Sequence, residues 1–133
     1  MIKSNRFYYT FLYILIGMLT ASSNHTFAQD IKPYVRIAKI VIDSTQLENY
    51  RAALKEHARA AVGKEPGVIT MYAVYDKEQP TNVTVFEMYA DVAAYQSHIH
   101  TTHFLKYKSV VKDMVRSLVL TDVEPIALET KPR

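Results

Sequence analysis

The chain of 133 residues contains no cysteine, and this absence excludes several kinds of site at once. Without thiols there are no disulfides, no thiolate metal ligands and no cysteine nucleophiles. A lipoprotein signal is excluded as well, because its lipid is attached to a cysteine. A chain without cysteine can still fold in an oxidising compartment, so the sequence stays compatible with export.

Glycine and charge of a single sign are also scarce. The three glycines form neither a phosphate-binding loop nor a dinucleotide-binding fingerprint, so no nucleotide or flavin is indicated. The 16 basic and 13 acidic residues nearly balance, whereas a nucleic-acid surface needs clustered Lys and Arg. Lys106, Lys108 and Lys112 have the spacing of a solvated helix face. No nucleic-acid partner is therefore expected.

The first 28 residues have the layout of a secretory signal peptide. A basic start precedes the apolar run Phe7–Leu19, and Thr26 and Ala28 are small residues at positions −3 and −1 of a cut before Gln29. A membrane-spanning helix needs about 20 apolar residues, and this run has 13. We expect cleavage between Ala28 and Gln29, a periplasmic or secreted protein, and no stable membrane anchor after cleavage.

The remaining residues, 29–133, are expected to form one domain with its core at about 34–128. Strand-like segments lie at 34–42, 68–75, 82–90 and 117–128, and helical ones at about 45–62, 92–100 and 103–115. Thr45 and Glu48 have the pattern of a capping box at the first helix. The β-α-β-β-α-β order predicts a ferredoxin-like α+β fold, with four antiparallel strands and the helices on one face.

The second and third strands are apolar on both of their faces. An antiparallel sheet with one face in water should instead alternate apolar and polar residues. The helices can cover one face only, and an exposed apolar sheet face marks a partner surface. A two-fold copy is the commonest solution, so the sequence predicts a homodimer.

One acidic residue, Glu87, and one histidine, His57, are candidates for chemistry. Glu87 lies in mid-strand between apolar neighbours and shares a face with Tyr89. It is either an acid or base of raised pKa that lines a pocket, or a structural carboxylate bound to Arg36 or a tyrosine. His57 lies on the apolar stripe of the first helix, where a packing role is commoner than catalysis.

Three further histidines, His98, His100 and His103, have a spacing that resembles a zinc site. Residues two apart on a helix diverge by about 200°, and no carboxylate near them in the sequence completes the set. We therefore expect no metal. Seven tyrosines follow residue 28, and a pocket walled by several of them would suit a flat aromatic ligand.

Several motifs in this order resemble the antibiotic-biosynthesis-monooxygenase family, which includes quinol monooxygenases. They are Glu65-Pro66-Gly67, the run Phe86–Tyr95, His98, and His103-Phe104, within a similarity that extends over about 34–128. The resemblance implies a dimeric α+β barrel with a pocket between the sheet and the helices. It also implies oxygenation of a small quinol or polyphenol by O2 without metal or flavin, with a protein base and a dry cavity.

The resemblance also suggests which residues form the site. By position it indicates Glu87, His98 and His103 as candidate catalytic residues and Tyr89 and Phe104 as substrate-binding residues. His57 and Tyr72 join the substrate-binding set from their residue chemistry alone.

The chain departs from the family pattern in two places. Family members often have tryptophan at the position of Tyr89, and haem-degrading relatives have an axial histidine about where this chain has Lys108. Haem degradation is therefore not expected. Two other functions stay open: a non-catalytic periplasmic ligand-binding or stress-response dimer, and an isomerase of small carbonyl compounds that uses the same acid and base residues.

Overall fold

The computed structural model describes residues 32–131, so the predicted signal peptide at 1–28 lies outside the described part of the chain. The elements follow one another as β1 (Tyr34–Ile42), the 3-10 turn η1 (Ser44–Gln46), α2 (Leu47–Lys64), β2 (Val68–Tyr75), β3 (Asn82–Tyr89), α3 (Val92–His98), α4 (Thr102–Val111) and β4 (Val115–Val123). None of the described helices is long and apolar enough to cross a membrane.

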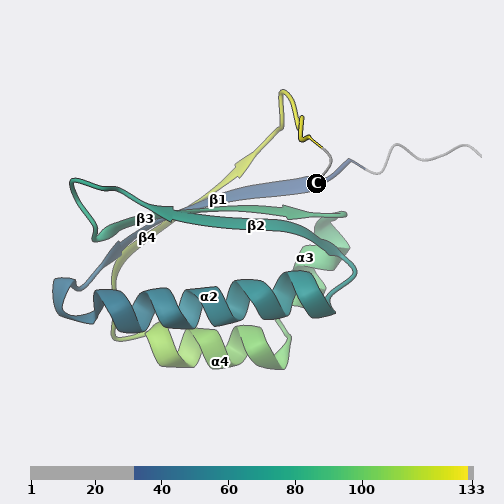
Figure 1. The fold of residues 1–133 in the computed structure, drawn as a ribbon. Helices are drawn as coiled ribbons and strands as arrows, with labels where there is room; N and C mark the ends of the chain where they lie inside the picture. The colour runs from purple at the N-terminus through teal and green to yellow at the C-terminus, as the bar shows by residue number, and fades with distance from the viewer. Residues whose placement is uncertain (1–31, 132–133) are drawn as a thin grey trace, which may run out of the picture.

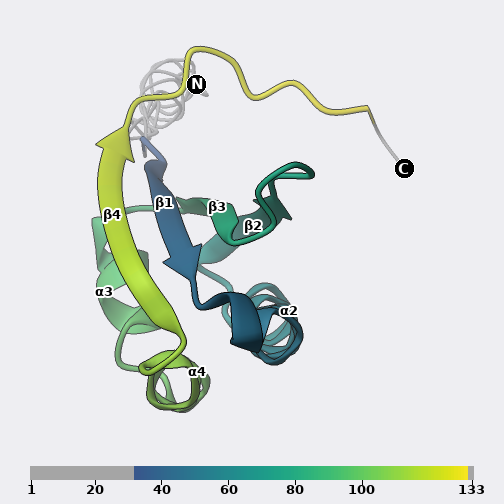
Figure 2. The ribbon, with the colours of Figure 1, turned by 90° about the vertical axis from the view of Figure 1, so that its left-hand side faces the viewer.

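The four strands form one antiparallel sheet in the order β2-β3-β1-β4. Helices α2 and α4 lie side by side beneath this sheet, and α3 covers one end of it (Figure 1). The predicted ferredoxin-like α+β fold is confirmed. The last strand ends at Val123, earlier than predicted, and the residues after it run away from the sheet (Figure 2).

The start of the first helical region differs from the sequence-based prediction. The side chain of Asp43 caps η1 by accepting hydrogen bonds from the backbone N–H of Thr45 at 2.8 Å and from its hydroxyl at 2.6 Å. The Thr45 hydroxyl is thus engaged by Asp43, and α2 begins at Leu47 without a side-chain cap. The predicted capping box is therefore wrong, because an acidic residue two positions earlier takes the cap.

The predicted stripe of the first helix is confirmed by burial. Tyr50, Leu54, His57 and Ala61 are all buried, and they face the sheet from successive turns of α2. Since these residues are three and four apart, one helix face delivers them all to the same layer. The stripe carries His57 into the interior between the sheet and α4.

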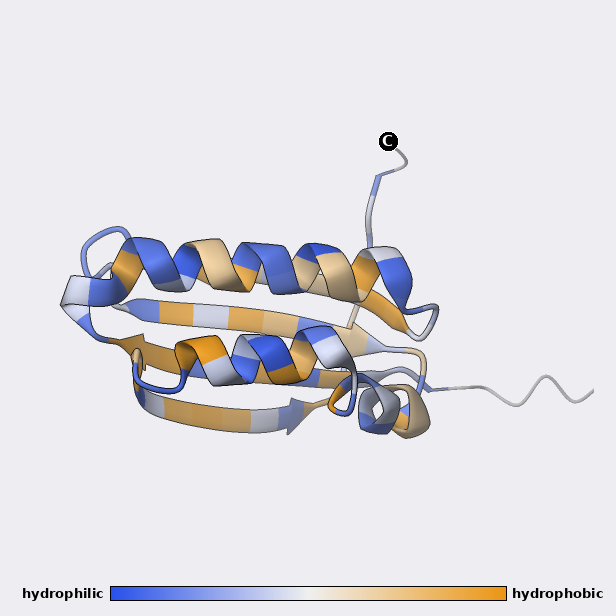
Figure 3. Cartoon of the chain, turned by 90° about the horizontal axis from the view of Figure 1, so that it is seen from below, coloured by the Kyte–Doolittle hydropathy of each residue, from blue (hydrophilic) through white to orange (hydrophobic). Residues whose placement is uncertain are grey.

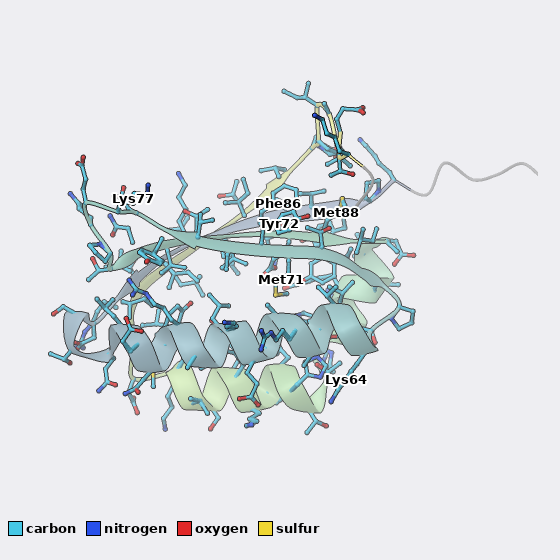
Figure 4. The ribbon with its side chains drawn as sticks, in the orientation of Figure 1. Lys64, Met71, Tyr72, Lys77, Phe86 and Met88 are labelled. Carbon is cyan, nitrogen blue, oxygen red and sulfur yellow. The ribbon has the colours of Figure 1, made fainter. Side chains whose placement is uncertain are left out.

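The sheet presents apolar residues on both faces, as expected. Met71 points toward the helices, whereas Tyr72, Phe86 and Met88 project from the opposite side (Figure 4). Ile37 pairs with Phe86, which in turn pairs with Tyr72, so the same open face extends across three strands. Within the described residues no helix covers this face.

Candidate functional site

A cavity of about 320 Å³ lies between the sheet and the helices. Its volume is at the lower end of the range for small-molecule sites, which suits a ligand of one or two rings. Ala38, Ile40 and Val85 form an apolar floor, and Leu54 and Val111 contribute from the helices. A ligand inside would therefore meet mostly apolar wall and a few polar groups.

Glu87 is the single carboxylic acid among the residues that line this cavity. Its Oε2 accepts a hydrogen bond of 3.0 Å from the hydroxyl of Tyr89. Within residues 32–131 no donor is bonded to its other oxygen, Oε1. Burial raises the pKa of Glu87, against the opposing effect of the Tyr89 hydrogen bond. The group thus holds its proton more firmly than an exposed carboxyl does.

Tyr89 fixes the orientation of this carboxyl and is itself fully buried. Burial, and then the neighbouring Glu87 carboxyl, raises the pKa of the Tyr89 phenol above its ordinary value. The phenol consequently keeps its proton and acts as a donor. Of the two structural partners considered for Glu87, the structure selects a tyrosine and not Arg36.

His57 reaches the same cavity from α2. Its ring is stacked on Tyr107 with centroids 4.6 Å apart and an interplanar angle of 11°. Only 4% of His57 is exposed, and its Nδ1 is buried without a hydrogen-bond partner among the described residues. Burial, followed by the nearby His98 and His103, lowers the pKa of His57 to about 4. The imidazole is therefore neutral at physiological pH, and its unsatisfied ring nitrogen is enclosed by protein.

Arg36 closes one end of the cavity, where it is held by three partners. Its guanidinium donates to Asp122 at 2.8 Å and to the hydroxyls of Tyr95 and Tyr34, both at 2.5 Å. Burial acts to lower the pKa of Arg36, but the hydrogen bond to Asp122 and the other contacts raise it overall. Arg36 is thus a fixed cation whose charge is balanced by a carboxylate.

Two lysines, Lys108 in the last turn of α4 and Lys112 at its C-cap, border the cavity as well. The sequence indicated a solvated helix face for them together with Lys106, and this interpretation is incomplete. Lys106 forms an ion pair with Glu56 on the other side of α4, at 2.6 Å. Lys108 and Lys112 instead flank the buried Val111 on the side that faces the cavity.

Two predicted catalytic histidines, His98 and His103, belong to a separate cluster. Oε1 of Glu65 is 2.8 Å from Nδ1 of His98 and 2.6 Å from Nε2 of His103. Neither histidine lines the cavity, but both of their rings lie beside His57, with centroids 5.2 and 5.7 Å away. The cluster thus packs against the His57 ring and joins the end of α2 to α3 and α4.

This cluster also contains a carboxylate, that of Glu65, which lies too far from the histidines in the sequence to have been predicted as a metal ligand with them. Glu65, His98 and His103 present ligand atoms that all lie within 4.8 Å of one another, so they are the residues best placed to hold a metal. The contacts of 2.6 and 2.8 Å have the length of hydrogen bonds, whereas ligands of a tetrahedral zinc would stand about 3.3 Å apart. The observed geometry is that of a carboxylate shared by two ring nitrogens.

The remaining predicted residues divide between two sides of the sheet. Glu87, Tyr89, His57 and Phe104 meet at the cavity. Tyr72 does not, because successive strand residues point to opposite faces and the adjacent Met71 takes the helix side (Figure 4). Tyr72 is 58% exposed on the open face, so its assignment to the pocket is corrected.

Sequence reasoning also missed several contributors. Tyr95, Tyr107, Lys108 and Lys112 line the cavity, and Glu65 binds the two histidines. For Tyr107 the signal was its place on the apolar side of the third helix. For Glu65 only its position in the Glu-Pro-Gly motif hinted at a role.

Comparison with known proteins places the chain in a family. A family described as "Antibiotic biosynthesis monooxygenase" matches residues 33–110. A Bacteroides thetaiotaomicron protein, provisionally assigned as an antibiotic biosynthesis monooxygenase, is 47% identical at a TM-score of 0.73, over 77% of this chain and 97% of that one. A provisionally assigned monooxygenase of Lactobacillus acidophilus shares the fold at 24% identity and a TM-score of 0.68, over 69% of this chain and 44% of that one. No curated protein sequence matches. The chain belongs to the antibiotic biosynthesis monooxygenase family.

Proposed function

We propose that this protein is a monooxygenase that uses O2 to hydroxylate a small quinol or phenolic aromatic. The observation that supports it is that Glu87, a carboxyl of raised pKa, and the neutral His57 line the same largely apolar cavity. Membership of the family supports the reaction class, and the cavity supports the kind of substrate. The role given to Glu87 in the reaction is part of the same proposal.

The first step is removal of a proton from a ring hydroxyl. A general base works best when its pKa lies near the working pH, and burial moves the pKa of Glu87 in that direction. Oε2 is held by Tyr89, so Oε1 is the oxygen directed to the substrate. The phenolate that forms is electron-rich and reacts with O2 more readily than the neutral phenol.

The overall reaction balances without any further reductant. A quinol and one O2 give a hydroxyquinone and one water: one oxygen atom enters a ring C–H bond and the other leaves as water. The quinol supplies all four electrons that O2 accepts. The neutral His57 ring lines the cavity, and the apolar wall would exclude bulk water from the reacting anion.

Oxygen uptake in the presence of a panel of hydroquinones tests the proposal. We expect the protein to exceed buffer autoxidation and to place one ¹⁸O atom from ¹⁸O2 in the product. Glu87→Gln should lower the rate by about 100-fold or more, the usual scale of a general base. Glu78→Gln, in the exposed turn between β2 and β3, is the matched control and should retain the wild-type rate.

The stability of Glu87→Gln at different pH values shows whether this variant keeps the fold. A carboxyl whose folded pKa is raised makes the folded protein less stable as pH rises above the unfolded pKa. Glu87→Gln should therefore be more stable than wild type at pH 8 and equal to it near pH 4. Equal oxidation rates for wild type, Glu87→Gln and buffer would contradict the enzymatic proposal. Saturable quinol binding with no oxygen uptake would assign a binding function instead.

A further inference from the structure

The ionised groups around the cavity are mostly cations. Arg36, Lys108 and Lys112 line it, against the one carboxyl of Glu87. Arg36 is balanced by Asp122 just outside. The two lysines therefore dominate the charge that an entering ligand meets.

Neither lysine has a partner that would cancel its charge. Within residues 32–131 no carboxylate lies within ion-pair distance of Lys108 or Lys112, while Lys106 on the same helix is paired with Glu56. Both lysines are exposed at their ends, although they belong to the cavity wall. They can bind an anion without first losing another contact.

The lysines mark the place where the cavity opens. Leu118 and Leu120 of β4 line the cavity and are nevertheless 42% and 50% exposed. Viewed from the helix side, β4 runs along the edge of the sheet beyond α4 (Figure 3). An opening between α4 and β4 therefore has an apolar strand on one side and two lysines on the other.

The distance from this opening to Glu87 fits a small aromatic acid. Glu87 pairs with Arg36 on β1, and Leu118 pairs with Ile40, four residues farther along that strand. Four strand residues correspond to about 13 Å along the sheet and two strand spacings to about 10 Å across it, which together give about 16 Å. One ring, a short acidic arm and a lysine side chain would span that distance.

We infer that the cavity takes a phenolic aromatic carboxylate, whose carboxylate is bound by Lys108 and Lys112 at the opening while its ring hydroxyl faces Glu87. The orientation toward Glu87 rests on the proposed function; recognition of the acid does not. A purely structural role for the lysines, favourable interaction with the negative end of the α4 dipole, predicts no ligand preference. Lys64 occupies the equivalent place in the last turn of α2 and lies outside the cavity, so it separates the two roles.

Anaerobic titration calorimetry tests the inference without any turnover. The probes are (2,5-dihydroxyphenyl)acetate and its primary amide, which differ in charge but hardly in size. Wild type should bind the acid about tenfold more tightly than the amide, since each exposed ion pair contributes about two- to fivefold. The preference should fall to within about twofold in Lys108→Gln/Lys112→Gln and in high salt. Lys64→Gln should keep it.

Three results would overturn the inference: no binding of either probe, equal binding of acid and amide by wild type, or a preference that survives in the double variant. A loss of equal size in Lys64→Gln would overturn it too, because the effect would then follow the overall charge. A lysine-dependent preference for the acid, with no oxygen uptake under air, would uphold anion recognition and reject the monooxygenase proposal.

Discussion

His57 is buried like a core residue and yet has a ring nitrogen without a partner. A buried polar atom without a hydrogen bond destabilises a fold by about 1–3 kcal/mol. Stacking on Tyr107 contributes to packing but does not satisfy the nitrogen. His57 also lines the cavity, so the cost of this unsatisfied nitrogen falls on a residue of the candidate site.

The lowered pKa of His57 predicts a stability that depends on acidity. The pKa of His57 is about 4 in the folded state, against an ordinary value of 6.5. Between pH 6.5 and 4 the unfolded chain therefore binds a proton at His57 that the folded protein does not bind. The free energy of unfolding should therefore decrease as pH falls from 6.5 to 4, by about 3 kcal/mol for the full difference. His57→Phe keeps an aromatic ring and should remove most of that decrease in urea unfolding at several pH values.

The matched control is His100→Gln, which changes an exposed histidine bonded to a backbone carbonyl. It should leave the acid-dependent decrease as in wild type. If His57→Phe and wild type lost stability in parallel between pH 6.5 and 4, the assignment of a depressed pKa to His57 would be wrong.

At the level of elements, Gly67 sets how closely β2 approaches α3. A Cβ atom at this position would lie 2.5 Å from Cβ of Ala94 in α3, and the Gly67 carbonyl accepts a hydrogen bond from Ala90 N–H at 2.9 Å. None of the described glycines has a positive φ, so the requirement is close contact and not backbone conformation. The glycine of the Glu-Pro-Gly motif thus lets α3 pack beside the Glu65 cluster.

Gly67→Ala should therefore destabilise the fold, by about 1–3 kcal/mol, the usual cost of overpacking. Ala94→Gly alone should cost about 1 kcal/mol through helix propensity. The double variant should be more stable than Gly67→Ala, because the second change removes the atom that the first one meets. Chemical denaturation of the four proteins measures this coupling, and strictly additive effects would refute the contact argument.

The elements themselves were largely predictable because their signals are local. Runs of β-branched and aromatic residues located the strands, and three–four spacing located the buried face of α2. Two-residue periodicity places Glu87 and Tyr89 on one strand face, and His57 meets them at one cavity. The failures depended on contacts between distant segments. Glu65 meets His98 and His103 across 33 and 38 residues, a pairing that spacing cannot reveal.

The lysines of α4 show the same limit. The sequence predicted one solvated face for Lys106, Lys108 and Lys112. Lys106 instead pairs with Glu56, whereas Lys108 and Lys112 border a cavity between α4 and the sheet, which their spacing does not show. A local pattern assigns a residue to a helix face; the neighbour of that face is decided by the whole fold.

At the level of the whole molecule, the open sheet face is the feature that lacks an explanation within one chain. Tyr72 and Val74 of β2 are 58% and 63% exposed, and Val119 of β4 is 54% exposed. Phe86 and Ile37 continue the row that starts at Tyr72, whereas Thr84 and Lys39 lie between Val74 and Val119, so the side away from the helices is largely but not wholly apolar. Monomeric proteins rarely expose an apolar surface that spans a whole sheet.

We expect two copies to pack through these faces, because the self-complementary apolar surface needs a cover and a two-fold contact provides one. A standard interface removes about 800 Å² per subunit from water. At about 25 cal/mol per Å² the gross gain is large beside a domain stability of about 5–15 kcal/mol, although ordering and desolvation consume much of it. Light scattering should give about twice the monomer mass, and the melting temperature should rise with protein concentration.

Val74→Glu should yield monomers, whereas Val62→Glu on α2, similarly exposed but on the helix layer, should not. A wild-type monomer at micromolar concentration would show that the open face is covered in some other way.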